Sequence, residues 1–247
     1  MRDQNRVLVF DTTALASGMS ANRVLGQGAF NTIDAGSGPN GLSGPCGMTL
    51  DVAGNRIWIA DRMNNRVLAH DAGSAASGTP AMVALGQADF SANANATTAT
   101  GLFQPQDVAF RESPARLFVA DTQNSRVAVF DTLTTGAAMS AALGQPDLVT
   151  GTAISTTRTG LNLPVGLAFD GTALYVTDQF NHRVVAFKSM ATGAAASTVI
   201  GATSFTVQGG GGGNASMINP TGLDFASGRL WVAEGNNSNH RVLLFQP

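Results

Sequence analysis

The stretch "IWIADRMNNRVLAHD" (57–71) joins an alternating apolar segment that ends in Asp to a word in which Asn precedes Arg-Val. The same phrase returns as "LFVADTQNSRVAVFD" (117–131), "LYVTDQFNHRVVAFK" (174–188) and "LWVAEGNNSNHRVLLF" (230–245). The chain begins with only the second half of it, "MRDQNRVLVFD" (1–11). The phrase is therefore the unit of an internal repeat, and a repeat of this length decides the architecture before any other feature.

Three markers recur with one period of 56 to 60 residues and in one order. The first marker is the Arg that opens the second apolar run, found at Arg6, Arg66, Arg126, Arg183 and Arg241. The second is a Leu-Gly-Gln word at 25–27, 85–87 and 143–145, which becomes Ile-Gly-Ala at 200–202. The third is a proline before an apolar run, found at Pro45, Pro105, Pro164 and Pro220. Their agreement excludes chance similarity between unrelated segments.

Each period predicts four short strands, because its apolar residues alternate with polar ones and Gly, Asn and Asp separate the runs. Strand a follows the proline, strand b ends in the acid, strand c is the Arg-Val run, and strand d ends at the Leu-Gly-Gln word. No segment carries a helical apolar stripe long enough for tandem helical hairpins. We therefore predict an all-β fold, a β-propeller of four-stranded antiparallel blades with about four repeats.

We expect a single propeller domain over 1–247. Its repeat units are about 1–40 (partial), 41–100, 101–159, 160–216 and 217–247 (partial). The predicted order begins at strand c and contains seventeen strands, one more than a four-blade ring needs. Either the N-terminal d strand completes the last blade of such a ring, or the chain is a fragment of a longer propeller, which we favour. In both cases the spare c strand over residues 5–11 is expected to pair with a second chain in a homodimer.

The composition limits the classes of partner. The net charge of −2, with 12% charged residues, gives no electrostatic reason to expect nucleic acid. Cys46 is the only cysteine, which excludes a disulfide framework within the chain. No apolar run approaches the roughly 20 residues of a membrane helix, so membrane insertion is not expected. The lysine-poor composition, rich in Ala, Ser, Thr, Asn and Gly, favours a bacterial exported or cell-surface protein over a cytoplasmic one.

The third repeat resembles the NHL-repeat β-propeller family most clearly. Its matching words are Pro164-Val165-Gly166-Leu167-Ala168-Phe169-Asp170, then Val176-Thr177-Asp178, then Asn181-His182-Arg183-Val184. The likeness extends over essentially the whole chain and implies the propeller fold. It implies little about activity, because this family combines binding scaffolds with a few enzymes.

The acids and arginines of the repeat are predicted to serve the scaffold. Each acid that ends strand b is expected to hold its Arg and the turn between them by charge-assisted hydrogen bonds. These structural positions are Asp61 with Arg66, Asp121 with Arg126, Asp178 with Arg183, and Glu234 with Arg241. A ring of metal ligands or general bases is the alternative, but a site needs one asymmetric cluster and a scaffold needs the same bond many times.

Two other recurring groups are given structural roles. The aromatic column of strand b is expected to lie between blades, in preference to forming a sugar-stacking platform. Its members are Trp58, Phe118, Tyr175 and Trp231. His182 and His240 occupy equivalent positions, but a zinc site would need a third ligand, so no metal site is predicted. Cys46 has no base beside it and is not expected to be a nucleophile.

Function is expected where the repeats differ. The turns between strands b and c and the long connections between d and a are predicted to emerge on one face, the top face, around a channel lined by strands a. Loops of that length are commonly functional. The candidate binding residues are Arg62, Met63, Asn64, Gln106, Asp107, Gln123, Asn124, Gln179, Phe180, His182, Asp224, Asn237 and His240.

Two functions from different classes are compatible with these residues. The favoured one is a binding or scaffold module that holds a peptide, glycan or protein partner without chemistry and without a cofactor. The alternative is a lyase or hydrolase that uses a divalent cation on the propeller axis, as the family resemblance allows. Asp107 and Asp224 are the charged residues that strand a offers for such a cation.

Overall fold

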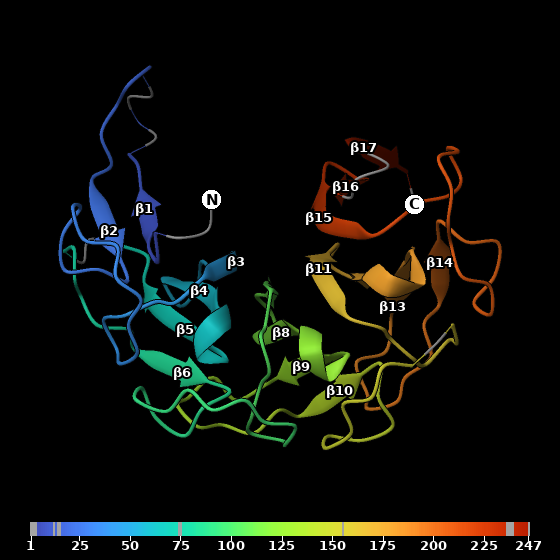
Figure 1. Cartoon of the computed structure of the whole chain (residues 1–247), viewed down its shortest axis with the longest axis horizontal. Helices are drawn as coiled ribbons and strands as arrows, with labels where there is room; N and C mark the ends of the chain where they lie inside the picture. The colour runs from blue at the N-terminus through green and yellow to red at the C-terminus, as the bar shows by residue number, and fades with distance from the viewer. Residues whose placement is uncertain are drawn as a thin grey trace.

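The structure is a computed structural model that describes residues 4–11, 13, 16–73, 76–154, 156–235 and 240–246. These residues form seventeen strands in five antiparallel sheets, which follow one another along an arc (Figure 1). The strand number and order are those predicted from the repeat. The described residues contain no helix long and apolar enough to cross a membrane. The fold is an all-β propeller.

The chain begins with two strands of a blade. This half-blade consists of β1 (Val7–Val9) and β2 (Arg23–Leu25). Blade 1 consists of β3 (Pro45–Asp51), β4 (Arg56–Asp61), β5 (Arg66–Asp71) and β6 (Val83–Leu85). Blade 2 consists of β7 (Asp107–Arg111), β8 (Arg116–Asp121), β9 (Arg126–Phe130) and β10 (Ala141–Leu143).

The second half of the arc repeats this plan. Blade 3 consists of β11 (Pro164–Phe169), β12 (Leu174–Asp178), β13 (Arg183–Phe187) and β14 (Thr198–Ile200). The last blade has three strands, β15 (Pro220–Ala226), β16 (Arg229–Gly235) and β17 (His240–Phe245). In each of these blades the innermost strand, a, pairs with b, and b pairs with c; in blades 1 to 3, c also pairs with d.

The end sheets do not join into a four-blade ring. β2 pairs with β1, with Val7 opposite Leu25, and β17 pairs with β16 alone within the described residues. The half-blade and the last blade lie at opposite tips of the arc (Figure 1). The arrangement in which the N-terminal d strand completes the last blade is therefore wrong, because that strand is already paired with its own hairpin partner.

The core is divided among the interfaces between successive blades. Each complete blade presents one apolar face, here called the forward face, to the next blade along the chain. Trp58 and Ala69 of blade 1 pack in this way with Leu117 and Phe130 of blade 2. The same contact recurs between blades 2 and 3 and between blade 3 and the last blade.

The aromatic column shows how burial depends on the following blade. Trp58, Phe118 and Tyr175 are buried between blades, as predicted. Trp231 is 39% exposed, because within the described residues no further blade covers the forward face of the last one. The prediction of a buried aromatic is wrong at this position for that reason.

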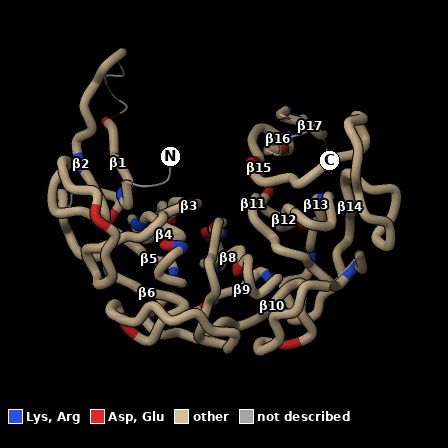
Figure 2. Tube along the Cα trace, in the orientation of Figure 1, with Lys and Arg blue, Asp and Glu red and all other residues tan. Residues whose placement is uncertain are grey.

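The a strands line the centre of the arc. β3, β7, β11 and β15 are neighbours in that order, and their side chains surround a cavity of about 250 Å³. Charged residues are sparse along the chain (Figure 2). The predicted channel lining is confirmed, and the top-face turns begin where these strands begin, since Pro45 pairs with Asp61 and Pro164 with Asp178.

Candidate functional site

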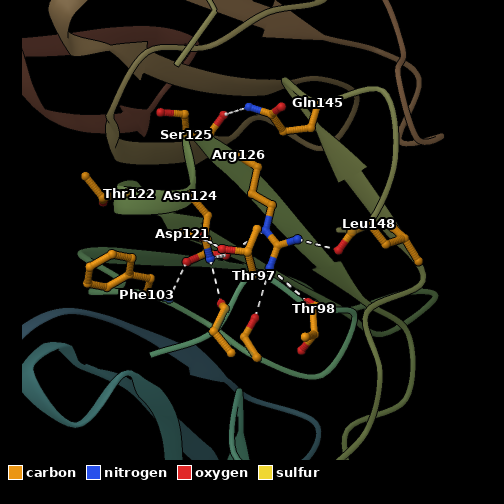
Figure 3. A network of polar contacts seen from close by, with 12 residues as sticks. Thr97, Thr98, Phe103, Asp121, Thr122, Asn124, Ser125, Arg126, Gln145 and Leu148 are labelled. Atoms are coloured by element: carbon orange, nitrogen blue, oxygen red, sulfur yellow. Dashed lines mark hydrogen bonds and ion pairs between the residues drawn. The ribbon is translucent and has the colours of Figure 1, made fainter. Parts of the chain in front are cut away.

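The turn between strands b and c is held by a buried carboxylate. In blade 2, Asp121 accepts hydrogen bonds from the Phe103 N–H (2.7 Å), the Asn124 side-chain amide (2.9 Å) and Arg126 Nε (2.7 Å), as Figure 3 shows. Burial raises the pKa of the Asp121 carboxyl, and the Arg126 charge is the largest influence that opposes this rise. A partnered carboxylate of this kind orders a turn, and because Asp121 is fully buried a ligand cannot reach it.

Arg126 connects this turn to two long connections. Its Nη1 donates to the Leu148 carbonyl (2.6 Å), and its Nη2 donates to the carbonyls of Thr98 (3.0 Å) and Gly101 (2.9 Å) (Figure 3). Thr98 and Gly101 precede blade 2, whereas Leu148 follows it. The guanidinium therefore fixes the loop on either side of its own blade.

The same ion pair is present in the other blades. Arg66 Nε lies 2.7 Å from Asp61, and Arg183 Nε lies 2.7 Å from Asp178, with both partners fully buried. In the last blade Arg241 pairs with Glu234, but the Arg241 side chain is 26% exposed. All eight predicted structural residues thus make the expected contact with one another.

The third residue of each turn also belongs to this network. Asn64 and Asn124, two of the candidate binding residues, are buried and donate to Asp61 (2.8 Å) and Asp121 (2.9 Å). Each also donates to a loop carbonyl, that of Gly36 or Ala96. Their amide N–H groups are used within the fold and do not face the top surface.

His182 has a partner that its sequence position did not reveal. It ends the turn of blade 3 in the left-handed region (φ 55°), and its Nδ1 accepts the Asn219 N–H of the last blade (3.1 Å). Asn65 occupies the equivalent position and accepts the Gln104 N–H (2.8 Å). The residue at this position therefore links successive blades, whether it is Asn or His.

The Leu-Gly-Gln word was used only as a marker of the period, yet each Gln has a structural role. Gln87 is buried and donates to the carbonyls of Asn65 (2.8 Å) and Ala94 (2.8 Å). Gly86 before it has φ +84°, and a Cβ there would lie 2.4 Å from Leu102. The repetition of Gly-Gln in three periods was the sequence signal for this role, because the same contact in each blade requires the same two residues.

The second residue of each described turn is exposed on the top face. Met63, Gln123 and Phe180 occupy this position, and Met63 and Phe180 are 52% and 49% exposed. Arg62 and Gln179, which open two of the turns, are half-buried, and Arg62 donates to Gln104 of the next blade (2.9 Å). Asn237 lies outside the described residues, and His240 is exposed at the start of β17.

The channel opens among these turns. Gln106 and Asp107 line a hollow of about 260 Å³ at its mouth, together with Cys46, Val165 and Thr221. Asp107 accepts the N–H groups of Val108 (2.9 Å) and Leu167 (2.8 Å), and so connects blade 2 to blade 3. Burial raises the pKa of Asp107 to about 7, against the effect of these two hydrogen bonds.

Asp224 does not join Asp107 at this mouth. It is exposed, and it lines the cavity between the a strands, which Asp107 also lines. Within the described part of the chain, no three His, Cys, Asp or Glu side chains are grouped closely enough to bind a metal ion. The exposed turn residues, Gln106 and His240 therefore lie at the ends of the blades where strands a begin, whereas Asp224 lines the cavity between these strands.

No protein-family model and no curated protein matches this chain. Similar solved structures are those of U3-55K (12% identity, 83% of this chain and 52% of that one, TM-score 0.51) and Kuenenia stuttgartiensis hydrazine synthase (13%, 88% and 49%, 0.50). A third is the β-propeller domain of Myceliophteria thermophila Cps50 (10%, 82% and 54%, 0.48). The chain spans about half the length of these relatives. At such identities the first two show the fold alone.

Proposed function

We propose that this β-propeller is a binding module that holds a protein or peptide partner on its top face without chemistry. The observation that carries this proposal is the exposure of Met63, Gln123 and Phe180 at one repeated position around the channel mouth. An exposed aromatic and a flexible thioether are side chains that favour protein interfaces. The resemblance of the repeat to the NHL family, which includes binding scaffolds, supports the same conclusion.

The charges of the molecule also favour this function. The acids of the repeat are engaged with arginines, and the exposed turn residues are neutral except for the half-buried Arg62. A neutral surface of amide, thioether and aromatic groups suits a partner with few charges. The long connections are well placed to shape this surface, because arginines fix their carbonyls.

A phage-displayed random peptide library, panned on the immobilised chain, tests this proposal. Peptides should be enriched on the natural protein and lost when Met63→Ser and Phe180→Ser are combined. Val52→Ser is the matched control, because Val52 is 77% exposed on the turn at the opposite ends of strands a and b. Enrichment that is equal on all three proteins, or absent from the natural one, would contradict the proposal, and glycan-array binding would assign the face to sugars.

A divalent-cation enzyme is the second candidate, because the Asp107 carboxyl faces the channel and its pKa is raised to about 7. Its two oxygens already accept backbone N–H groups, so we favour the binding module. If Ca²⁺ or Zn²⁺ at stoichiometric concentration raised the melting temperature and Asp107→Asn abolished the rise, the enzyme would be the better proposal.

A further inference from the structure

The last blade exposes an apolar face that the complete blades bury. Trp231, Val242 and Leu244 are 39%, 63% and 45% exposed and lie on its forward face. The equivalent residues of blade 1 are fully buried against blade 2. These equivalents are Trp58, Val67 and Ala69. The forward face of the last blade is therefore shaped by the repeat to be covered by the backward face of another blade.

The opposite end of the arc exposes such a backward face. Met48 and Leu50 of β3 are 54% and 56% exposed. The residues equivalent to Met48 in blades 2 and 3, Val108 and Leu167, are 3% and 4% exposed, because strands of the preceding blade cover them. Before β3 the described chain supplies only β1 and β2, which are strands c and d, so the place of strands a and b stays open.

The two ends also carry nearly the same strand. β1 follows Arg6 in the sequence Arg-Val-Leu-Val-Phe, and β17 contains Arg241 in the sequence Arg-Val-Leu-Leu-Phe. β2 pairs with β1 in the register that β6 uses with β5, with Val7 opposite Leu25 as Val67 is opposite Leu85. β17 has an edge without a partner strand in the described chain. β2 can therefore accept β17 in place of β1 with the same register.

The two strands are not held equally. Arg241 of β17 donates its Nε to Glu234, and Leu243 and Phe245 pack against blade 3. Arg6, beside β1, has a buried Nε with no hydrogen-bond partner among the described residues. The carboxylate that would meet it belongs to strand b of the same blade. Between the two strands, β1 is the one with an unsatisfied buried donor, which costs free energy that β17 does not incur.

We propose that two copies of this chain associate head to tail, with β15, β16 and β17 of one copy and β2 of the other forming one complete blade. β1 of the second copy is released, so that β17 takes its place beside β2. Trp231, Val242 and Leu244 then pack against β3, β4 and β5 of the second copy, as their equivalents do within the chain. Met48 and Leu50 are covered by the same contact.

This arrangement uses every open feature of the two ends. The last blade gains its fourth strand at the free edge of β17. The Nε of Arg6, which is buried without a partner among the described residues, becomes exposed to water when β1 is released. The forward face of the last blade and the backward face of blade 1 are different surfaces, so each copy can use its forward face to bind one copy and its backward face to bind another. A closed pair would have eight blades, four from each copy, which is within the usual range of propellers. The spare strand predicted from the sequence is thus released on association and is not the strand that pairs with the second copy.

Light scattering after size exclusion, over a range of concentrations, tests the association. The natural chain should reach at least twice the mass of one chain. Trp231→Glu on the forward face and Leu50→Glu on the backward face should each raise the dissociation constant by about 30-fold or more, as the loss of a central apolar contact does. Val149→Glu is the control, because Val149 is 62% exposed on a connection away from both faces. A natural chain that stays monomeric would overturn the proposal.

Mixing the two variants distinguishes head-to-tail association from contact between identical faces. Trp231→Glu keeps an intact backward face, and Leu50→Glu keeps an intact forward face, so the mixture should form a heterodimer through one natural junction. If the chain associated through identical faces, forward with forward or backward with backward, the mixture would contain no such heterodimer. The head-to-tail arrangement would then be wrong.

A disulfide tests the exchanged strand directly. Leu244 lies three residues after Arg241, as Val9 lies three after Arg6, and Val9 is opposite Arg23. Arg23→Cys combined with Leu244→Cys, in a chain that also carries Cys46→Ser, should form a disulfide between chains under oxidising conditions. Leu244→Cys alone in the same background is the control. An associated protein that does not form this cross-link would show that β17 does not pair with β2, and would overturn the exchange.

Discussion

Blade 2 and the two end sheets are formed by copies of the same sequence repeat, but equivalent residues in them make different contacts. The Arg126 guanidinium is fully buried with donors on four acceptors, whereas the equivalent Arg6 has no partner for its Nε among the described residues. Trp58 is buried and Trp231 is 39% exposed. The difference shows that the contribution of a repeat residue to stability depends on the neighbouring blades as much as on its own blade.

The largest expected effect comes from the arginine of a complete blade. Arg126→Ala should lower the free energy of unfolding by about 3 to 5 kcal/mol, because it leaves the buried Asp121 without its counter-charge. Arg6→Ala is the matched substitution in the half-blade and should cost about 1 kcal/mol or less, since the described residues give Arg6 no such ion pair. Urea denaturation of both variants measures the difference, and equal losses would show that the end blade is as tightly held as the centre.

The tryptophans give the same comparison for apolar contacts. Trp58→Ala should cost about 3 to 5 kcal/mol, because a large buried side chain leaves a cavity between blades 1 and 2. Trp231→Ala should cost clearly less in the monomer, because its ring is already 39% exposed. The measurement belongs at a protein concentration at which the chain is monomeric. A Trp231→Ala loss as large as that of Trp58→Ala would mean that the forward face of the last blade is covered within a single chain.

His70 makes blade 1 sensitive to acid in a way that blades 2 and 3 are not. Phe130 and Phe187 occupy the equivalent positions, whereas His70 places a buried imidazole there, and the Thr79 backbone opposes the effect of burial on its pKa only in part. Burial lowers the pKa of His70 from 6.5 to about 4. The folded state therefore binds the proton less well than the unfolded chain, so stability is full above pH 6.5 and is lost as the pH falls from 6.5 towards 4.

His70→Phe should remove that loss. Between pH 7 and pH 4 the natural protein should lose about 3 kcal/mol more than the variant, since one pKa unit corresponds to about 1.4 kcal/mol. Because the carboxylates and the other two histidines are the same in both proteins, the difference between their two pH profiles isolates His70. Parallel profiles would show that His70 is not protonated on unfolding in this range.

The sequence predicted the local structure of this protein well. The spacing of Asp61, Arg66 and their equivalents placed strands b and c and the acid–arginine pair, because both follow from residues close in the chain. It could not give the loop carbonyls that Arg126 binds, which lie 22 to 28 residues away. Nor could it give the exposure of Trp231, which depends on whether another blade follows in space. Asn64 was predicted at the surface, but it donates both to Asp61 in its own turn and to the Gly36 carbonyl in a distant loop, and the second contact could not be predicted from the sequence.

The candidate site was predicted in part. Met63 and Phe180 differ between repeats, and the structure places both on the surface. His182 and Asp107 also differ between repeats, but each accepts a backbone N–H from a neighbouring blade. Variation within a repeat therefore indicates either an exposed residue or a different side chain that makes the same contact. Only the positions of the surrounding backbone distinguish the two.

The smallest expected effect concerns the Gln of the repeated word. Gln87→Ala should cost about 1 to 3 kcal/mol, because the carbonyls of Asn65 and Ala94 lose their donor at a buried position. The repeat itself supplies the comparison, since Ala202 stands at this position after blade 3, where Gly209 approaches the His182 carbonyl instead. Ala202→Ser, which changes that position without inserting a long side chain, should leave the free energy of unfolding within about 0.5 kcal/mol. If Gln87→Ala left the free energy of unfolding equally unchanged, water would satisfy the carbonyls of Asn65 and Ala94 in place of Gln87. The repeated Gln would then not be needed to hold the connection that leads to the top face.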